Sequence, residues 1–432
     1  MFKTLRNIWR VEDLRSRILF TLLVLIVYRI GSFVPVPGVD KTVFEQVNQQ
    51  GSELFGLLNT FSGGALSKFS IFALGIMPYI TSSIIVQLLS MDVIPKFAEW
   101  AKQGEHGKKK LAQFTRYGTV ILGLIQAFAT SIGFNRLYGA RMVPDATFVT
   151  YLMIAIILTA GTSFLMWLGE QITEKGIGNG ISIIIFAGIV ANIPQYIRDT
   201  VQSEFIQADQ LFLNIVKLII IALVVILIIV GVIYIQQAIR KIPVQYAKRV
   251  VGNKMYGGQN THIPLKINSA GVIPVIFAVS LLQFPIIIAS FWAGKGWAQW
   301  ITTHMYYDKP LGMVLYVLMI IGFTYFYTFV QMNPTQMADN MKKNGGYVPG
   351  IRPGKTTATY LTKVMSRLTM TGALFLAVIS VLPVFFGTVA GLPRSVKIGG
   401  TSLLIIIGVA LDTMKQIESQ LIKRHYKGFI KK

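Results

Sequence analysis

The sequence predicts an all-α polytopic membrane protein, with ten transmembrane helices arranged as two inverted five-helix halves. Composition predicts the membrane class: of 432 residues, 53% are hydrophobic and only 14% are charged, and the mean hydropathy is +0.58. A water-soluble domain of this length needs more charge to cover its surface. The distribution of basic residues and two repeated strings predict the arrangement of the helices.

Ten apolar segments have lengths suited to crossing a membrane. The expected spans are residues 18–34, 69–90, 117–134, 148–168, 180–197, 212–235, 270–290, 311–330, 369–389 and 400–414. Most of the 41 Lys and Arg residues fall in the two ends of the chain and in the even-numbered loops. Because positive charge stays in the cytoplasm during insertion, we expect a multi-pass protein with both termini cytoplasmic.

Two short strings occur twice, once in each half of the chain. Gly-x-x-Pro-x-Ile stands at 75–80 and 271–276, and Gly-x-Ser-x-x-Ile at 180–185 and 400–405. The pairs fall on the second and seventh spans and on the fifth and tenth. Because five spans are an odd number, a second copy must face the opposite way across the membrane. We therefore expect two halves, residues 1–205 and 206–432, although single short matches in isoleucine-rich sequence also arise by chance.

The stretch before the second span is apolar but interrupted. It contains Asn59, Ser62 and the adjacent pair Gly63 and Gly64. A glycine in a helix interior costs about 1 kcal/mol relative to alanine. Irregular backbone at membrane depth persists only where it is buried in protein or lines a cavity. We expect a short half-helix at about 58–67, folded into the protein, and a full span from about residue 69; an interfacial amphipathic turn is the alternative.

Two loops on the expected cytoplasmic side, residues 236–268 and 331–368, are long and basic. Loops of this length are usually functional or disordered. The segment 244–251 has the β-branched and aromatic content of a strand, which predicts a hairpin in the first loop.

The residues offer little support for an enzyme. The chain has no cysteine, its four histidines are scattered, and no phosphate-binding Gly-x-x-x-x-Gly-Lys-[Ser/Thr] loop is present, so we expect no metal, cofactor or ATPase activity. The middles of the spans carry no carboxylate, whereas ion-coupled transporters normally bury one. Arg29, near the external end of the first span, is expected to snorkel toward water.

With carboxylates absent, the recurring side chains in the middles of the expected spans are isoleucines. The repeated strings match Ile80 with Ile276 and Ile185 with Ile405, and residues four apart lie on one helix face. If the halves meet on a two-fold axis, these side chains converge into an apolar constriction, which excludes ions by dewetting and suits a passenger of arbitrary sequence. Ordinary core or lipid-facing packing is the alternative for each single residue. The expected ring is Ile76, Ile80, Ile181, Ile185, Ile276 and Ile405.

Longer strings resemble the signatures of the SecY family of protein-conducting channels. Residues 70–80 with Gln87 are similar to the first signature of that family, and residues 167–182 to the second. Further similar strings, which extend the resemblance over essentially the whole chain, are 61–67, 247–249, 261–266, 348–354 and 399–405.

The resemblance implies an hourglass pore between the two halves, with the isoleucine ring at its waist. It also implies a plug that fills the external funnel at rest, and a lateral gate between the second and third spans on one side and the seventh and eighth on the other. By position the plug comprises Phe61, Ser62, Gly63, Gly64, Ala65, Leu66 and Ser67. The gate residues are Ser83, Gln87, Asn268 and Phe284.

The resemblance further implies partners. Family members dock a ribosome, through its RNA, or the motor ATPase SecA on their basic loops, and they assemble with the small membrane subunits SecE and SecG. The expected docking residues are Arg352, Arg249, Lys248 and Lys254. Relatives often carry paired arginines where this chain has Asn253-Lys254, so Lys254 ranks below Arg352 and Arg249. Anionic lipids are also expected as partners of the basic loops. For the other lysines of these loops, the alternative is that they only form a solvated basic face.

The expected function is a passive, gated conduit in the bacterial cytoplasmic membrane for unfolded, signal-sequence-bearing polypeptides, which releases apolar segments sideways into lipid. A motor ATPase or a translating ribosome must supply the driving force. Two alternatives stay open: a secondary transporter with inverted repeats and broken helices, and a membrane scaffold that recruits ribosomes.

Overall fold

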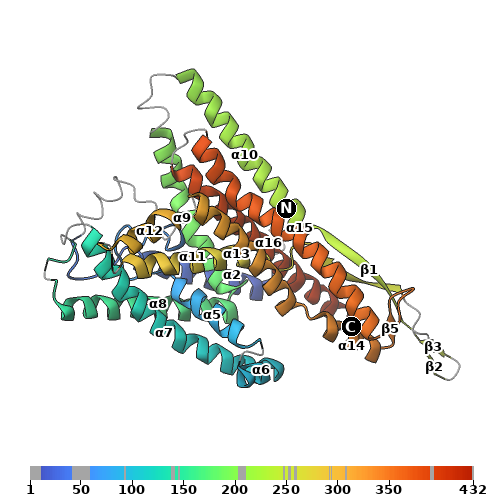
Figure 1. Cartoon of the computed structure of the whole chain (residues 1–432). Coiled ribbons are helices and arrows are strands. Elements are labelled where there is room, and N and C mark those ends of the chain that lie inside the picture. Colours follow the sequence, from blue (N-terminus) through green and yellow to red (C-terminus); the bar gives the residue numbers. More distant parts are fainter. Residues whose placement is uncertain are drawn as a thin grey trace.

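The protein is a bundle of long helices with a small sheet projecting from one end (Figure 1). The computed structural model describes residues 11–40, 59–91, 94–137, 142–144, 146–202, 211–246, 249–251, 254–256, 260–290, 292, 294–306, 309–389 and 394–430.

Each of the ten expected spans overlaps a helix of the described chain. The first five are α2 (Glu12–Gly31), α5 (Met77–Leu89), α7 (Gly104–Leu137), α8 (Phe148–Lys175) and α9 (Gly180–Val201). The second five are α10 (Leu211–Gln237), α11 (Ile273–Ser290), α13 (Pro310–Gln331), α15 (Lys355–Val389) and α16 (Arg394–Ile430). Short helices α6 (Pro95–Lys102), α12 (Gly296–His304) and α14 (Pro334–Lys343) lie between them.

Six of the described helices are long and apolar enough to cross a membrane, namely α7, α8, α9, α10, α13 and α15. Helices α5 and α11 are apolar but shorter. The all-α polytopic fold class is therefore confirmed. Helices α7, α15 and α16 are longer than the expected spans, because their polar ends continue as helix past the apolar segment.

The two long basic loops fold onto each other. Strand β1 (Ile239–Tyr246) pairs with β4 (Asn260–Lys266) and with β5 (Gly346–Tyr347) of the second loop, both antiparallel. Strands β2 (Arg249–Val251) and β3 (Lys254–Tyr256) form the tip of the hairpin, so the expected hairpin is confirmed. Residues of both loops share one apolar cluster, which joins the loops into a single folded unit. Its buried members are Ile242, Val244, Leu265, Ala338, Met341, Val348, Leu361 and Met365.

Residues of the first and last described helices share one apolar cluster. Leu14 at the start of α2, Ile177 after α8 and Ile417 late in α16 are buried in one small apolar cluster. The start of α2 and the later part of α16 therefore lie close together.

The two Gly-x-x-Pro-x-Ile strings adopt the same local conformation. Gly75 and Gly271 have positive φ angles of 57° and 64°, which glycine adopts without the cost that a side chain adds. In both copies a helix begins two residues later, and its second residue is Pro78 or Pro274. Proline suits this first turn because its missing N–H would be unpaired there anyway. The Gly-x-Ser-x-x-Ile strings differ, since α9 begins at Gly180 whereas α16 begins upstream of residue 400.

The expectations for the interrupted stretch were partly wrong. Of the described residues in the expected half-helix, only 59–61 are helical. Residues 62–76 form turns and a bridge, and the following helix begins at Met77 rather than near residue 69. The reason is a run of left-handed backbone, with positive φ at Gly63, Gly64, Phe69 and Gly75. A right-handed helix cannot continue through such residues.

Replacing Gly161 with Ala is expected to destabilise the bundle. A Cβ atom there would collide with the carbonyl of Ile71, so α8 and the turn segment would have to separate. We expect a cost of about 1–3 kcal/mol, which is typical of overpacking. Gly322→Ala in α13 is the matched control, because a Cβ atom there meets no atom within 4 Å. Thermal unfolding of the purified complex in detergent measures both; equal midpoints for the two variants would contradict the close packing.

Candidate functional site

The expected ring isoleucines lie in one apolar cluster that joins both sets of helices. Ile80 of α5, Ile185 of α9, Ile276 of α11 and Ile405 of α16 are all buried in it. Ile76, directly before α5, is buried there too, and the sixth residue, Ile181, packs against the cluster half-buried. The cluster is larger than a single ring, since other residues from α2, α8, α13 and α15 belong to it.

Helices from the two sets meet along two lines. Helix α11 packs against α5 and α7, and on this seam the hydroxyl of Ser280 lies 3.9 Å from the sulfur of Met77. Helix α9 packs against α16, where the turn at Gly178 approaches Thr413. The apolar cluster fills the space between these two contacts, so the seam between α5 and α11 is closed in this structure.

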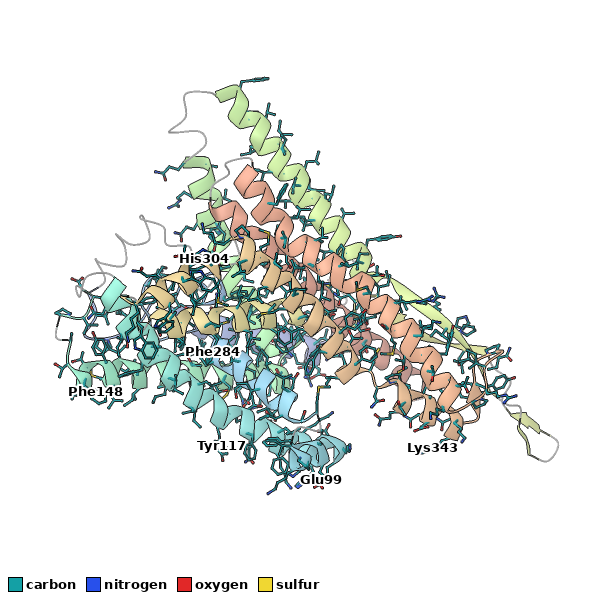
Figure 2. All side chains as sticks on the ribbon, in the orientation of Figure 1. Glu99, Tyr117, Phe148, Phe284, His304 and Lys343 are labelled. Carbon is teal, nitrogen blue, oxygen red and sulfur yellow. The ribbon has the colours of Figure 1, made fainter. Side chains whose placement is uncertain are left out.

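The four expected gate residues lie on or next to the helices that form this seam. The side-chain amide of Gln87 donates to the hydroxyl of Ser83 at 3.2 Å, and that of Asn268 donates to the carbonyl of Gly271 at 3.0 Å. Phe284 is half-buried on α11 (Figure 2). The structure records these as two separate hydrogen-bonded pairs.

Several amide oxygens near the seam have no hydrogen-bond partner among the described residues. They are Oε1 of Gln87, Oδ1 of Asn268 and Oε1 of Gln283. Gln283 precedes Phe284 and follows Ser280 by three positions, so it neighbours Ser280 on the helix surface. The sequence analysis missed Gln283, although an amide within the apolar helix α11 was the available signal.

The expected plug residues are packed inside the helix bundle. Phe61, Ser62, Ala65 and Leu66 are buried, and Gly63 is buried as well. Gly64 and Ser67 are half-buried. Side chains within the segment satisfy its own backbone: Ser62 Oγ accepts from the N–H of Leu66 at 3.2 Å, and Asn59 Oδ1 accepts from the N–H of Ser67 at 2.9 Å.

Side chains of helix α2 bind the backbone carbonyls of this segment. The hydroxyl of Tyr28 donates to the carbonyl of Ser62 at 3.1 Å, and Nη1 of Arg29 donates to the carbonyl of Gly63 at 2.8 Å. The backbone of Gly63 also lies against Gly188 of α9, on the same side as the Tyr28 hydroxyl: a Cβ atom on Gly63 would come within 2.5 Å of that hydroxyl and 2.8 Å of the Gly188 Cα. The expectation that Arg29 simply snorkels was therefore incomplete, and Tyr28 was missed because a tyrosine in an apolar span gives no distinctive signal.

Two cations share one ring beside this contact. Nζ of Lys68 lies 3.3 Å from the ring centroid of Phe33, and the guanidinium carbon of Arg29 lies 4.9 Å from it. Partial burial, and next the nearby charge of Arg29, lower the pKa of the Lys68 ammonium from its ordinary value. The ring offers its negative face to both charges and so offsets part of their repulsion.

A strand-like contact fixes the far end of the segment. The N–H of Val36 donates to the carbonyl of Phe69 at 3.1 Å, and the N–H of Ile71 donates to the carbonyl of Val34 at 2.9 Å. Residues 59–71 are thus held by α2, by the turn after it and by α9. Irregular backbone inside the bundle gains its hydrogen bonds in this way.

The expected docking residues lie at the sheet end of the molecule. Arg352 is exposed between β5 and α15, and its carbonyl accepts from Thr357 Oγ1 at 2.8 Å. Arg249 and Lys254 stand on the paired strands β2 and β3 at the hairpin tip. Lys248 lies outside the described residues.

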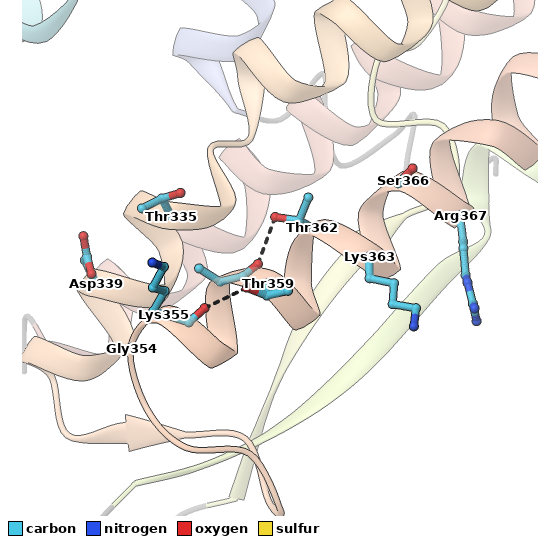
Figure 3. A pocket seen from close by; sticks show the side chains of 10 residues that line it. Thr335, Asp339, Gly354, Lys355, Thr359, Thr362, Lys363, Ser366 and Arg367 are labelled. Atoms are coloured by element: carbon cyan, nitrogen blue, oxygen red, sulfur yellow. Dashed lines mark hydrogen bonds between the residues drawn. The ribbon is translucent and has the colours of Figure 1, made fainter.

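A groove of about 800 Å³ opens beside Arg352, between α14 and the first turns of α15 (Figure 3). Its walls carry Lys355, Lys363 and Arg367 against one carboxylate, Asp339. The hydroxyls of Thr359 and Thr362 are directed back to α15, where they donate to the carbonyls of Lys355 and Ala358 at 3.1 and 2.9 Å. The groove is therefore a basic surface next to the loop rather than an enclosed ligand pocket.

The described residues contain no group of three or more His, Cys, Asp or Glu side chains that could hold a metal ion. Among them, no charged side chain is buried. The core of the site consists of aliphatic and aromatic side chains, with serine, threonine and amide groups at its edges.

The helix bundle, its buried apolar cluster and the buried turn segment fit one class, the polytopic α-helical membrane channels. Comparison with known proteins agrees. The SecY family model matches residues 70–414. The chain is 62% identical to the protein translocase subunit SecY of Halalkalibacterium halodurans and 59% identical to that of Bacillus subtilis, over the full length of each chain. The chain belongs to the SecY family, whose members are channel subunits and not enzymes.

Solved structures share the fold at low sequence identity. The chain resembles a structure described as a protein conducting channel, with a TM-score of 0.63, 18% identity, and coverage of 94% of this chain and 92% of that one. It also resembles Sec61 in the canine ribosome-channel complex from the endoplasmic reticulum, with a TM-score of 0.61, 16% identity, and coverage of 94% and 92%.

Tyr28→Phe is expected to loosen the segment of residues 59–67, because it removes the hydroxyl that donates to the carbonyl of Ser62. The substitution keeps the aromatic ring, whose centroid lies 6.1 Å from that of Phe72. Losing one neutral hydrogen bond costs about 1 kcal/mol, or about a fivefold increase in the population of the opened segment. Hydrogen–deuterium exchange of peptides covering this segment measures the change. Tyr234→Phe on the exposed face of α10 is the control. Unchanged exchange in Tyr28→Phe would show that the hydroxyl does not hold the segment.

Proposed function

We propose that this chain is the central channel subunit of a protein translocase and acts as a passive, gated conduit for unfolded polypeptide. The observation that carries the proposal is the convergence of isoleucines from α5, α9, α11 and α16 in one buried apolar cluster. An apolar constriction blocks ions without binding them and offers a passing chain neither charge nor hydrogen bonds. The absence of buried charge among the described residues supports this role.

The proposed constriction is formed by Ile76, Ile80, Ile181, Ile185, Ile276 and Ile405. Residues 61–67 are the proposed plug, and Tyr28 and Arg29 hold it in the resting position through the carbonyls of Ser62 and Gly63. A plug held by a few hydrogen bonds can leave as one piece when a passenger enters. The two proposed halves, residues 1–205 and 206–432, move apart at the α5–α11 seam.

The proposed lateral gate is this seam, with Ser83 and Gln87 on α5, Asn268 before α11 and Phe284 on it. The unpaired amide oxygens of Gln87, Asn268 and Gln283 favour this assignment. A buried unpaired polar atom costs about 1–3 kcal/mol, and opening the seam to water or to a polar passenger removes that cost. The closed seam is thus less stable than a fully apolar contact of the same area.

We place the channel in the bacterial cytoplasmic membrane, with the sheet end and both termini in the cytoplasm. The excess of basic residues at that end supports this orientation. The unfolded, signal-sequence-bearing polypeptide then enters from the sheet end, and apolar segments leave through the seam into lipid.

Cytosolic partners are proposed to dock on Arg352, Arg249, Lys248 and Lys254, with the groove between α14 and α15 extending the surface. Two structural neighbours were solved with ribosomes, Sec61 in the canine ribosome-channel complex and the yeast Ssh1 complex bound to the 80S ribosome, which favours a ribosome partner. The basic surface is proposed to contact the ribosomal RNA. SecA is the proposed motor ATPase, and SecE and SecG are the proposed small membrane subunits.

Anionic lipids are proposed to bind where α6 folds against α7. The Trp100 ring is edge-on to that of Phe97 and tilted against that of Phe114, with ring centroids 5.3 and 5.4 Å apart. Nζ of Lys96 and of Lys110 lie 5.8 and 5.6 Å from the Trp100 ring centroid. Aromatic rings beside lysines at a membrane surface suit acyl chains and acidic headgroups together. Tyr117 continues this surface along α7 (Figure 2).

A polypeptide conduit predicts direct contact between passenger and constriction. A photoreactive residue at Ile80 or Ile405 is expected to crosslink an arrested nascent chain whose length spans the membrane, because both positions lie in the apolar cluster. Ile219 on the exposed face of α10 is the control position. Crosslinks from Ile219 alone would favour the scaffold, and substrate-dependent uptake of a small molecule by the purified protein would favour the transporter.

Replacing Ile80 and Ile276 together with serine is expected to raise the resting ion conductance. Hydroxyl groups stabilise water in a constriction that apolar side chains keep dry. Planar-bilayer recordings of the reconstituted complex measure the leak. Ile288→Ser, on an exposed face of the same helix α11, is the control. A leak equal to wild type in the double variant would remove these residues from the seal.

Arg352→Glu is expected to impair partner-driven translocation by at least tenfold, because the charge reversal replaces attraction by repulsion at a docking surface. Assembly is expected to stay intact, since the side chain is exposed. Lys343→Glu, with the same change on an exposed face of α14, tests whether total loop charge matters. SecA-dependent translocation into proteoliposomes is the measurement, and equal losses in both variants would contradict a specific role for Arg352.

A further inference from the structure

The short helix α12 carries a patch of exposed aromatic rings that the channel function leaves unused. Trp292, Trp297 and Trp300 are 45%, 46% and 53% exposed. The rings of Trp292 and Trp297 have centroids 5.6 Å apart, and the Trp300 ring stacks on that of His304 at 5.1 Å. A cluster of exposed large aromatic side chains marks an interaction surface.

One face of α12 is bound to the protein. Ala298 is fully buried, and Ile301 and Thr302, three and four positions later, are half-buried. This face rests on α11 and α13. This contact fixes the rotation of α12 about its own axis, so its remaining faces point away from the protein.

The outward part of α12 divides into an aromatic and a polar face. Trp297, Trp300 and His304 are spaced by three and four positions and share one face. Gln299 and Thr303, also four apart and both exposed, form the other. A helix with an apolar aromatic face beside a polar face is typical of a helix lying in the plane of the membrane–water interface.

The position of α12 in the fold agrees with such a location. Strand β4 precedes α11, and α14 follows α13, so the sheet lies at the opposite ends of these two helices from α12. His304 and Lys343 accordingly lie far apart along the bundle (Figure 2). On α13, the exposed stripe of Leu311, Val314 and Leu318 begins just after α12. An exposed apolar surface of a membrane helix therefore begins a few residues after α12 in the chain.

We propose that α12 lies in the membrane–water interface of the leaflet opposite the sheet, with Trp297 and Trp300 among the ester carbonyls of phospholipids and Trp292 beside them. An indole ring combines an apolar body with an N–H donor, which ester carbonyls satisfy and hydrocarbon does not. Gln299 and Thr303 face water. The lipid-bound helix tethers the end of α11, the helix that packs against α5 and α7 on the seam. This inference rests on the membrane fold and not on the polypeptide passenger.

Because the chain has no cysteine, a single introduced cysteine can report the environment of each face. Trp300→Cys and its matched control Gln299→Cys are spin-labelled in the assembled complex, which is reconstituted in vesicles of phosphatidylethanolamine and phosphatidylglycerol. We expect the label at 300 to relax more with oxygen than with a water-soluble nickel chelate, and the label at 299 to show the reverse order.

Other outcomes overturn the proposal. Preferential relaxation of both labels by the nickel chelate would show that α12 stands in water. Protection of the label at 300 from both reagents would show that protein covers the aromatic face. Trp297→Cys repeats the measurement with Trp300 in place, should Trp300→Cys fail to assemble, and the yield of assembled complex separates misfolding from exposure.

Discussion

The structure depends on satisfying an irregular backbone segment inside a bundle of membrane helices. Residues 62–76 leave the helical pattern inside the bundle, where unpaired N–H and C=O groups are costly. Tyr28 and Arg29 of α2 donate to the carbonyls of Ser62 and Gly63, and Asn59 and Ser62 accept from N–H groups within the segment. Gly188 permits the close approach of α9. These contacts place α2, α9 and the start of α5 around one centre.

Two kinds of contact meet at that centre, and they differ in polarity. The isoleucine cluster is apolar and buried, so separating it exposes hydrophobic surface to water. The α5–α11 seam includes three amide oxygens that have no partner among the described residues, so a polar group or water that reached them would offset part of the cost of separating it. The centre therefore combines an apolar cluster with a seam that contains polar side chains. Both properties follow from which side chains the helices present rather than from any charged switch.

The basic loops are folded by the same rules as a soluble domain. Strands β1, β4 and β5 bury Ile242, Val244 and Leu265 against α14 and α15. Ile351, next to Arg352 in the chain, packs against the same cluster. At the other end, the short helix α12 presents tryptophans outward. The bundle thus has a cationic end and an aromatic end, which suits a molecule oriented across a membrane.

The amino-acid sequence alone determined the fold class, the positions of ten helices and the hairpin, because hydropathy and β-branched content are local properties. It also singled out the isoleucines that gather in one cluster and the glycines that precede α5 and α11. Only the tertiary structure decided that residues 62–76 form turns, that Tyr28 and Arg29 hold them, and that Gln283 lies unpaired near the seam. These features depend on partners distant in the chain, and the local pattern of a single segment does not specify which neighbour will meet its polar groups.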